Sequence, residues 1–416
     1  MTSRFSRRSV LQTGLALGAA PLVAHPILSY GQGETPIKIG MHDPLTGTYA
    51  AEGDSEVRGA KMAVAEINAK GGVIGRKIEL VVEDDNANAG LAAQKAHKMI
   101  EKDGCAMLMG AVSSATALSV SQVANQKGVV YMVTGGHTDP VTGSECHWTT
   151  FRICTTTYML AAGLVNTLAS KFGKKWYFIT PDYAFGHTFQ AAYAKILKSL
   201  GGTVLGNSLS PLGTTDFSSY LIKAQSTNPE VLILLVDGQD LVNCMKQAVQ
   251  FGLQKKMPIG GGLSELEVLN ALPREARLGW WTLEWYWNQP DTPHVKEWVA
   301  SYRKAYPDGS YPSARTWFGY AGTHAPALGA AKARSVEPAK LARALEGLEL
   351  PPEIKLQPNK VYFRPQDHQL MSSEFPGEII ADGKYPDLFK VADIVPGDKT
   401  SLPVAETGCK LVYPST

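Results

Sequence analysis

The sequence lacks three features that would assign it to a common functional class. After the first thirty-odd residues it has no apolar run of the ~20 residues that a membrane-spanning helix needs. Its 40 Lys and Arg residues are balanced by 38 Asp and Glu residues without a basic block, so nucleic acid is not expected as a partner. A phosphate-binding loop, a Gly-x-Ser-x-Gly motif and a His-Glu-x-x-His motif are all absent. We therefore expect a protein that is not an enzyme.

Cysteine is also scarce, and its spacing excludes the usual metal sites. No two of the five cysteines are separated by two residues, and no histidine cluster lies beside them, so we expect neither a metal nor a cofactor. Cys105 and Cys244 lie in apolar surroundings and are expected in the core. Cys146, Cys154 and Cys409 are the candidates for a disulfide, and the sequence leaves open which two are paired.

The N-terminus differs in composition from the rest of the chain. A basic head that contains Arg7 and Arg8 precedes an apolar, Gly/Ala-rich run at residues 11–24, which is typical of an export signal. The segment 6–11 resembles a twin-arginine signal. An apolar anchor that is never removed is the alternative. We expect residues 1–33 to direct the chain to the periplasm as a soluble protein.

Short β-branched runs alternate with amphipathic segments from residue 36 to residue 260, and a break at 142–157 divides them into two blocks. The expected strands lie at 37–41, 78–82, 107–109, 129–133, 176–180, 204–209, 231–236 and 257–259. Alternation of this kind predicts an α/β fold in which helices cover both faces of a parallel sheet. Two such blocks predict two lobes.

We expect each lobe to be built from two stretches of the chain. Residues 34–150 with 288–361 are expected to form one lobe. Residues 151–287 with 362–416 are expected to form the other lobe and a C-terminal tail.

The loops that follow the expected strands are rich in Gly, Ser and Thr. Ligands of parallel α/β sheets bind at this edge, where loops and helix N-termini meet. Ser113 and Ser114 begin a helix, whose free N–H groups suit a carboxylate, although a simple helix cap is the alternative. His137 lies in another of these loops without a Ser or Cys partner that the sequence can assign.

Aromatic residues are concentrated at 280–287. Read as a strand, the segment alternates between two faces, and we expect Trp280 and Trp281 in the interior. Trp285 and Tyr286 lie near an expected crossing between the lobes, where they either pack in the interior or face a ligand. An aromatic wall there would suit an apolar or aromatic solute.

Several separate segments resemble the branched-chain amino-acid-binding family, the type I periplasmic binding proteins that bind leucine, isoleucine and valine. The resemblance covers about residues 36–398, and the matching segments occur in the same order. They include 36–40, 44–47, 58–63, 66–76, 84–85, 110–114, 138–140, 182–186, 216–218 and 246–252.

This resemblance implies two Rossmann-like lobes that are joined by three crossings and close over a small solute. It also implies a partnership with the permease subunits of an ABC importer, and we expect a monomer. Ser113 and Ser114 would bind a ligand carboxylate, Gly136 would offer its carbonyl to an ammonium group, and Thr138 its hydroxyl and N–H groups. Phe185 stands in the place of a family tyrosine and would stack on the ligand, with Tyr183 beside it.

Three residues depart from the family pattern and leave the ligand open. Glu52 stands where amino-acid binders often have an aromatic residue, with Tyr49 close by. Asp237 falls near a second aromatic position, and we interpret it as a candidate partner for an ammonium group. The expected ligand is an amino acid or a similar small carboxylate or aromatic acid. A sensor domain of a signalling system and a binder of amides or urea-like solutes are the alternatives.

Overall fold

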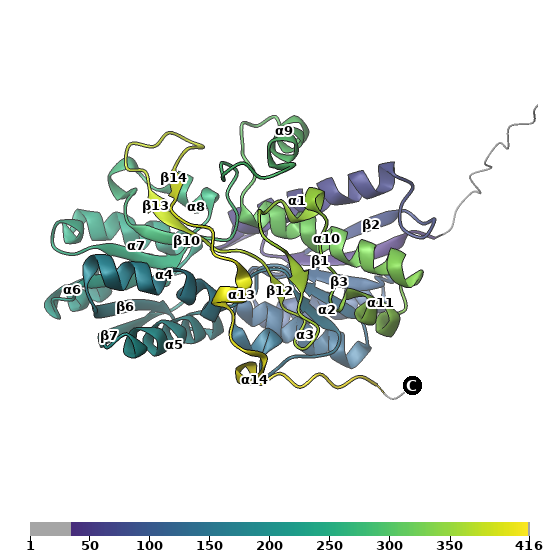
Figure 1. The fold of residues 1–416 in the computed structure, drawn as a ribbon, viewed down its shortest axis with the longest axis horizontal. Coiled ribbons are helices and arrows are strands. Elements are labelled where there is room, and N and C mark those ends of the chain that lie inside the picture. The colour runs from purple at the N-terminus through teal and green to yellow at the C-terminus, as the bar shows by residue number, and fades with distance from the viewer. Residues whose placement is uncertain (1–34, 415–416) are drawn as a thin grey trace, which may run out of the picture. The chain divides into compact units, whose positions relative to one another are not determined.

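Two β-sheets dominate the computed structural model, which describes residues 35–414 of the chain (Figure 1). The expected export signal at residues 1–33 lies outside the described residues. A five-stranded sheet and the helices on it form lobe 1, and a seven-stranded sheet and its helices form lobe 2. The predicted α/β class with two parallel-rich sheets is confirmed.

Lobe 1 is built on a sheet in which every neighbouring pair of strands is parallel, in the order β2-β1-β3-β4-β5. Its strands are β1 (Ile37–Asp43), β2 (Ile78–Asp84), β3 (Met107–Gly110), β4 (Val130–Val133) and β5 (Thr150–Arg152). Its helices are α1 (Ala50–Ala69), α2 (Ala89–Glu101), α3 (Ser114–Lys127), η1 (Asp139–Thr142), α9 (Val295–Ala305), α10 (Ala314–Ala333), α11 (Pro338–Leu345) and α12 (Pro352–Lys355).

Lobe 2 is built on a mixed sheet in the order β14-β13-β10-β9-β8-β6-β7, in which β13 is antiparallel to both of its neighbours, β10 and β14. Its strands are β6 (Lys175–Pro181), β7 (Thr203–Ser210), β8 (Val231–Leu234), β9 (Ile259–Leu263), β10 (Trp280–Leu283), β13 (Phe375–Ile379) and β14 (Phe389–Val391). Its helices are α4 (Thr157–Phe172), α5 (Ala184–Ser199), α6 (Ser218–Ser226), α7 (Gly238–Gln250), η2 (Leu253–Lys255), α8 (Leu266–Ala271) and η3 (Arg274–Ala276).

The central strands of each sheet are buried on both faces, which explains why they are continuous apolar runs in the sequence, whereas the edge strands β2 and β7 are partly exposed. In β3, Met107 and Met109 join the core under α1 and α10, whereas Leu108 joins the core under α2 and α3. In β6, Tyr177 and Trp176 enter different cores in the same way. Successive side chains of a strand point to opposite faces, so a strand covered twice needs apolar residues at every position.

The chain passes between the lobes at three crossings, as the resemblance implies, before the C-terminal tail makes a further passage. The crossings join β5 to α4, β10 to α9, and β12 (Leu370–Met371) to β13. Side chains link the crossings to one another: Glu284, directly after β10, accepts hydrogen bonds from the backbone N–H (2.6 Å) and hydroxyl (2.7 Å) of Thr155. Gln369, before β12, donates to the carbonyl of Cys154 at 2.8 Å.

The expected change of lobe at residue 361 differs from the observed packing. The hairpin of β11 (Tyr362–Phe363) and β12 belongs with lobe 1, because Phe363 and Leu370 lie in the lobe 1 core. The ring of His368, in the hairpin loop, stacks on Phe151 with the ring centroids 3.8 Å apart. This pairing joins residues more than 200 positions apart, which local patterning cannot detect.

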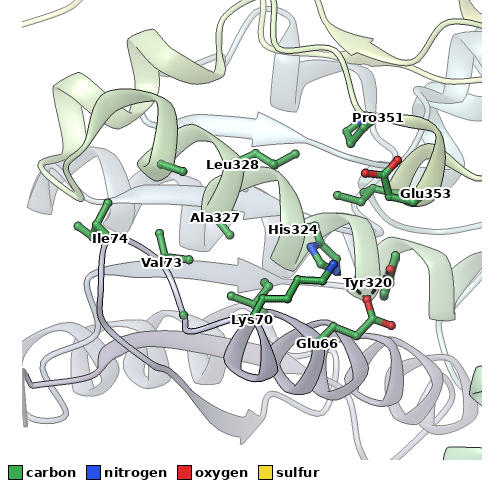
Figure 2. A pocket seen from close by; sticks show the side chains of 14 residues that line it. Glu66, Lys70, Val73, Ile74, Tyr320, His324, Ala327, Leu328, Pro351 and Glu353 are labelled. Atoms are coloured by element: carbon green, nitrogen blue, oxygen red, sulfur yellow. Dashed lines mark hydrogen bonds and ion pairs between the residues drawn. The ribbon is translucent and has the colours of Figure 1, made fainter. Parts of the chain in front are cut away.

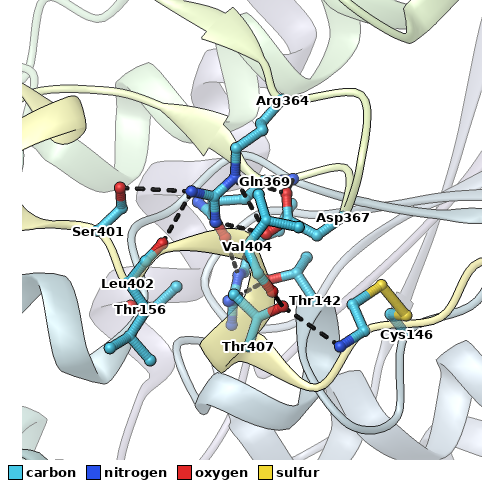
Figure 3. Close-up of polar contacts among 12 residues, drawn as sticks. Thr142, Cys146, Thr156, Arg364, Asp367, Gln369, Ser401, Leu402, Val404 and Thr407 are labelled. Atoms are coloured by element: carbon cyan, nitrogen blue, oxygen red, sulfur yellow. Dashed lines mark hydrogen bonds and ion pairs between the residues drawn. A yellow bond between two sulfur atoms is a disulfide. The ribbon is translucent and has the colours of Figure 1, made fainter.

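The C-terminal tail returns from lobe 2 to lobe 1 after β14, in short helices α13 (Gly397–Thr400) and α14 (Val404–Thr407). Cys409 forms a disulfide with Cys146 of lobe 1, which resolves the pairing that the sequence left open (Figure 3). Arg364, in the lobe 1 hairpin, donates to the carbonyl of Leu402 at 2.9 Å. Cys154, the third disulfide candidate, is buried with a free thiol, as are Cys105 and Cys244.

Loss of the disulfide is expected to destabilise the protein. The bond joins residues 263 positions apart, so replacing Cys146 and Cys409 by Ser frees a very long loop in the unfolded chain. We expect the free energy of unfolding to fall by about 2–5 kcal/mol, measured by urea denaturation. The unmutated protein in reducing agent should match the double variant, and the variant should not respond to the agent. Equal stability of the oxidised and reduced proteins would contradict this expectation.

Candidate functional site

The residues singled out in the sequence lie mostly at the interface between the two lobes. Each follows the carboxyl end of a strand, where parallel α/β sheets bind their ligands. Lobe 1 contributes the loop before α1, the start of α3 and the segment after β4. Lobe 2 contributes the segments that join β6 to α5, β8 to α7 and β9 to α8.

Ser113 and Ser114 begin α3, as predicted, and their hydroxyl groups differ in their contacts. The Ser114 hydroxyl accepts a hydrogen bond from the backbone N–H of Thr138 at 3.1 Å. The Ser113 hydroxyl is buried and has no hydrogen-bond partner within residues 35–414, and it does not cap the helix. Burying a hydroxyl without a hydrogen-bond partner costs free energy of folding. The Ser113 hydroxyl also lies beside backbone N–H groups that favour negative charge.

The segment that follows β4 contacts both lobes. Thr138 hydrogen-bonds through its hydroxyl to the Ala184 carbonyl (3.2 Å) and the Thr188 hydroxyl (3.1 Å) of lobe 2. His137 Nε2 lies 2.6 Å from the carboxylate of Glu284 on the second crossing. Burial raises the pKa of Glu284, but the contact with His137 and the hydrogen bonds from Thr155 together outweigh it and leave that pKa below its usual value.

The carbonyl group that the resemblance assigned to an ammonium has a protein partner. Arg152 Nη1 donates to the Gly136 carbonyl at 3.2 Å and to the Thr138 carbonyl at 2.6 Å. A carbonyl oxygen has two lone pairs, so one site on Gly136 is still available for a ligand.

Aromatic residues from the two lobes meet at the interface. The hydroxyl of Tyr49, at the start of α1, is 2.8 Å from the hydroxyl of Tyr183, at the start of α5. Phe185 packs near both Tyr183 (ring centroids 6.0 Å apart) and His137 (5.9 Å). The backbone N–H of Gln239 also donates to the Thr48 carbonyl at 3.2 Å, so the lobes touch through backbone as well as side chains.

A buried arginine that the sequence analysis did not single out lies at the centre of this interface. Arg315 Nη1 is 3.1 Å from the carboxylate of Glu56 in its own lobe, and its Nε is 3.0 Å from the carboxylate of Glu265 in lobe 2. Its Nη2 is 3.8 Å from the carboxylate of Asp237, also in lobe 2. Only 1% of the Arg315 side chain is exposed, so its charge depends on these partners.

Close packing of α1 against α10 brings Arg315 and Glu56 together. A side chain at Gly59 would lie 1.9 Å from the Thr316 carbonyl oxygen, and one at Gly319 would lie 1.9 Å from the Glu56 carbonyl oxygen. Only glycine permits backbones to approach so closely. A capping box in which Ser313 and Thr316 bond to each other starts α10 one residue before Arg315. An arginine among apolar residues at the start of a helix was the available sequence signal.

Carboxyl groups outnumber cations at this interface. We call Glu52, Glu56, Asp237 and Glu265 the carboxyl cluster. Burial raises the pKa of all four groups, and that of Glu56 reaches about 7. The negative charge of Asp237 raises the pKa of Glu52 further, although Arg315 opposes the rise. Such a site favours a bound group that carries positive charge or several N–H donors.

Trp285 and Tyr286 are not brought together with the other candidates. The Trp285 ring donates to the Leu356 carbonyl at 2.8 Å and packs against Trp298 in the lobe 1 core. The Tyr286 hydroxyl donates to the Pro386 carbonyl at 3.1 Å, and its ring lies in the lobe 2 core. Of the two interpretations left open in the sequence, interior packing is the one that the contacts support.

A separate cavity of about 310 Å³ lies within lobe 1, away from these residues. Figure 2 shows Glu66 and Lys70 of α1 facing Tyr320 and His324 of α10 across it. Tyr320 donates to the Glu66 carboxylate at 2.8 Å. None of the site residues expected from the sequence lines this cavity.

Residues 35–414 contain no group of three or more His, Cys, Asp or Glu side chains that could hold a metal ion. They also contain no helix that is both long enough and apolar enough to span a bilayer.

Comparison with known proteins assigns the family. The family model for periplasmic binding proteins matches residues 36–384. A Leu/Ile/Val-binding protein homolog of Brucella suis is 27% identical over 352 residues, which cover 81% of this chain and 86% of that protein.

Two solved structures are similar over most of the chain. A periplasmic binding protein from Burkholderia mallei is 32% identical with a TM-score of 0.83, covering 90% of this chain and 98% of that one. An amino acid ABC transporter substrate-binding protein from Pseudomonas fluorescens is 28% identical with a TM-score of 0.80, covering 91% of this chain and 100% of that one. The resemblance noted in the sequence is confirmed, and the chain belongs to the periplasmic binding protein family.

Proposed function

We propose that this protein is the solute-binding component of an ABC importer and that it captures an amino acid between its lobes. Membership of the family supports the transport role, and the Pseudomonas relative, described as an amino acid binder, supports the cargo class. One observation carries the proposal. The start of α3, with the unpartnered Ser113 hydroxyl, favours a negative group, and the carboxyl cluster at the same interface favours a positive one, which is what a zwitterion requires.

The carboxylate end of the cargo is proposed to bind at the start of α3. Four N–H groups at a helix N-terminus lack partners within the helix, and the helix dipole favours negative charge there. Ser113 would donate its hydroxyl to the carboxylate, and Ser114 would contribute its backbone N–H. Thr138 lies beside them through its bond to Ser114.

The ammonium end is proposed to bind to Asp237 and Glu265. Asp237 Oδ1 and both carboxylate oxygens of Glu265 are buried and have no hydrogen bond within the described chain, although Arg315 pairs with both residues electrostatically. An ammonium group supplies three N–H donors and a positive charge, which would satisfy these oxygens. Tyr183 and Phe185 would cover the cargo from the lobe 2 side.

Lobe closure is the proposed mechanism of capture. Arg315 of lobe 1 forms an ion pair with Glu265 of lobe 2, and the Thr138 hydroxyl of lobe 1 donates a hydrogen bond to lobe 2. These contacts form only when the lobes are together. A cargo that bridges Ser113 and Asp237 would add contacts to the closed state alone and thereby shift the equilibrium toward it. The closed form would then be presented to the permease subunits.

We further propose that the protein acts as a monomer and does not convert its cargo. The absence of nucleophile and metal motifs from the sequence supports binding without chemistry. The near balance of charge gives no reason to expect nucleic acid as a partner.

A thermal-shift panel tests the cargo class. A ligand that binds only the folded protein raises its stability by RT ln(1 + [L]/Kd), so amino acids should raise the melting temperature more than amides or aromatic acids do. With the best amino acid, Ser113→Ala should weaken binding roughly tenfold, because it removes a hydrogen bond to a charged group.

Two controls accompany this panel. Ser113→Ala should leave the melting temperature without ligand unchanged, because the hydroxyl has no partner in residues 35–414. Ser170→Ala, on the exposed side of α4, should change neither stability nor affinity. A panel in which only amides or aromatic acids shift the melt would refute the proposed cargo.

The stability of the protein without cargo is expected to fall as pH rises from 4.5 to about 7. Burial raises the pKa of Glu56 from 4.5 to about 7, so in this range the folded chain keeps a proton that the unfolded chain has released. The stabilisation that this retained proton provides is complete below pH 4.5 and is lost as the pH rises through about 7. Thermal melts across the range measure it, and Glu56→Gln should reduce the dependence without abolishing it, because burial also raises the pKa of Asp240 to about 6. Stability that rises with pH would contradict this assignment.

Export is expected to require the arginine pair. We propose that residues 6–11 act as a twin-arginine signal, so replacing Arg7 and Arg8 together by Lys should leave the precursor in the cytoplasm. Cell fractionation and immunoblotting measure this, with Arg4→Lys as the matched control. Normal export of the double variant would show that another route is used.

A further inference from the structure

A second cavity, of about 220 Å³, lies at the interface between the lobes beside the proposed cargo site. Residues at the start of α1 form one wall, and residues of α7 and α8 form the other. The lining residues are Gly47, Thr48, Ala50, Ala51, Glu52, Gly238, Gln239, Val242, Glu267, Val268 and Ala271. A cavity with walls from both lobes exists in this form only when the lobes are together.

Two carboxylate oxygens in this lining have no partner. Glu52 Oε1, from lobe 1, and Glu267 Oε2, from lobe 2, are both buried and make no hydrogen bond to any residue in 35–414. The other oxygen of Glu267 accepts a hydrogen bond from Ser313 at 2.5 Å, which holds that carboxylate in position. Buried polar atoms are normally hydrogen-bonded, so two unpaired oxygens in one cavity require an explanation.

Among residues 35–414, no cation forms an ion pair with either of these two carboxylates. Arg315 directs its ion pairs to Glu56, Asp237 and Glu265. Asp237 adds a further negative charge beside Glu52, and burial together with this charge raises the pKa of Glu52. Apart from the polar residues Thr48 and Gln239, the remaining lining consists of Gly, Ala and Val, which suits the methylene groups of a flexible chain.

The approach of the two walls depends on a glycine. Gly238 has a φ of +59°, and a side chain there would lie 2.9 Å from Glu52 Oε1 and 2.8 Å from the Thr48 carbonyl oxygen. A glycine at this point brings α7 close to Glu52 without filling the space in front of its carboxylate.

We propose that this cavity binds a side-chain cation of the cargo, so that the protein selects a basic amino acid. The inference rests on the proposed function, in which the α-carboxylate and α-ammonium groups occupy Ser113 and Asp237. An ammonium or guanidinium group on the cargo side chain would donate to Glu52 and Glu267 together. Glu52, at a position where the related family often has an aromatic residue, is then the residue that determines specificity.

Two amino acids of equal chain length test the proposal. L-Lysine carries a side-chain ammonium that L-norleucine lacks, while their α-groups are the same. Isothermal titration of the full secreted protein should give a lysine affinity at least about tenfold above that for norleucine. In Glu52→Gln the lysine affinity should fall by about tenfold or more, while the norleucine affinity changes by less than about threefold.

Two further variants make the result specific. Glu267→Gln should also lower the lysine affinity. The result then does not rest on Glu52→Gln alone, where a folding defect would have the same effect. Glu66→Gln, in the separate lobe 1 cavity, removes a carboxylate that lines no part of this interface and should change neither affinity. Thermal melts establish that each variant is folded.

The outcomes separate the two levels of the proposal. If norleucine binds as tightly as lysine, or if Glu52→Gln leaves the preference for lysine unchanged, the cation site is refuted and the amino acid function stands. If neither amino acid binds and no other amino acid shifts the melt, the proposed function fails and the cation site fails with it.

Discussion

The buried charge of Arg315 is the constraint on which the arrangement of the two lobes depends. A guanidinium group cannot be deprotonated in a protein, so its burial is tolerated only with carboxylates around it. Glu56 comes from the same lobe, whereas Glu265 and Asp237 come from the other lobe. In the closed arrangement the lobe 2 carboxylates pair with the Arg315 charge. Separation of the lobes would leave that part of the charge to solvent. Arg315 links the electrostatics of the site directly to lobe movement.

The crossings between the lobes belong to the same polar network. Glu284 lies on the second crossing and bonds both to Thr155 on the first crossing and to His137 in the site. The third crossing joins this network because Gln357 donates to the Glu284 carbonyl at 3.3 Å and accepts from the Ser373 N–H at 2.8 Å. A backbone rotation in one crossing would therefore alter the hydrogen bonds of the other crossings and of His137. The hinge and the binding loops are parts of one hydrogen-bonded unit.

The sequence predicted the parts of the fold that depend on local pattern. Strands buried on both faces were found because they are continuous apolar runs, and Ser113 and Ser114 were found because hydroxyl residues precede a helical pattern. The short β5 has only three residues and gives no such signal. Arg315 was missed because its partner Glu56 is 259 positions away, and only the packing of α1 on α10 unites them. Trp285 and Tyr286 were also beyond local pattern. Alternation along a strand shows that two side chains point to opposite faces, but it does not show which core each face packs against.

The disulfide between Cys146 and Cys409 closes residues 146–409 into a covalent ring. All of lobe 2 and all three crossings lie between these cysteines in the sequence, so every residue of lobe 2 belongs to a closed circuit that begins and ends in lobe 1. A single proteolytic cut anywhere in that circuit, including a cut in a crossing, would leave one covalently connected molecule. The carrier can therefore survive one backbone break in the compartment where proteases and oxidants act, provided that the sulfur bridge stays intact.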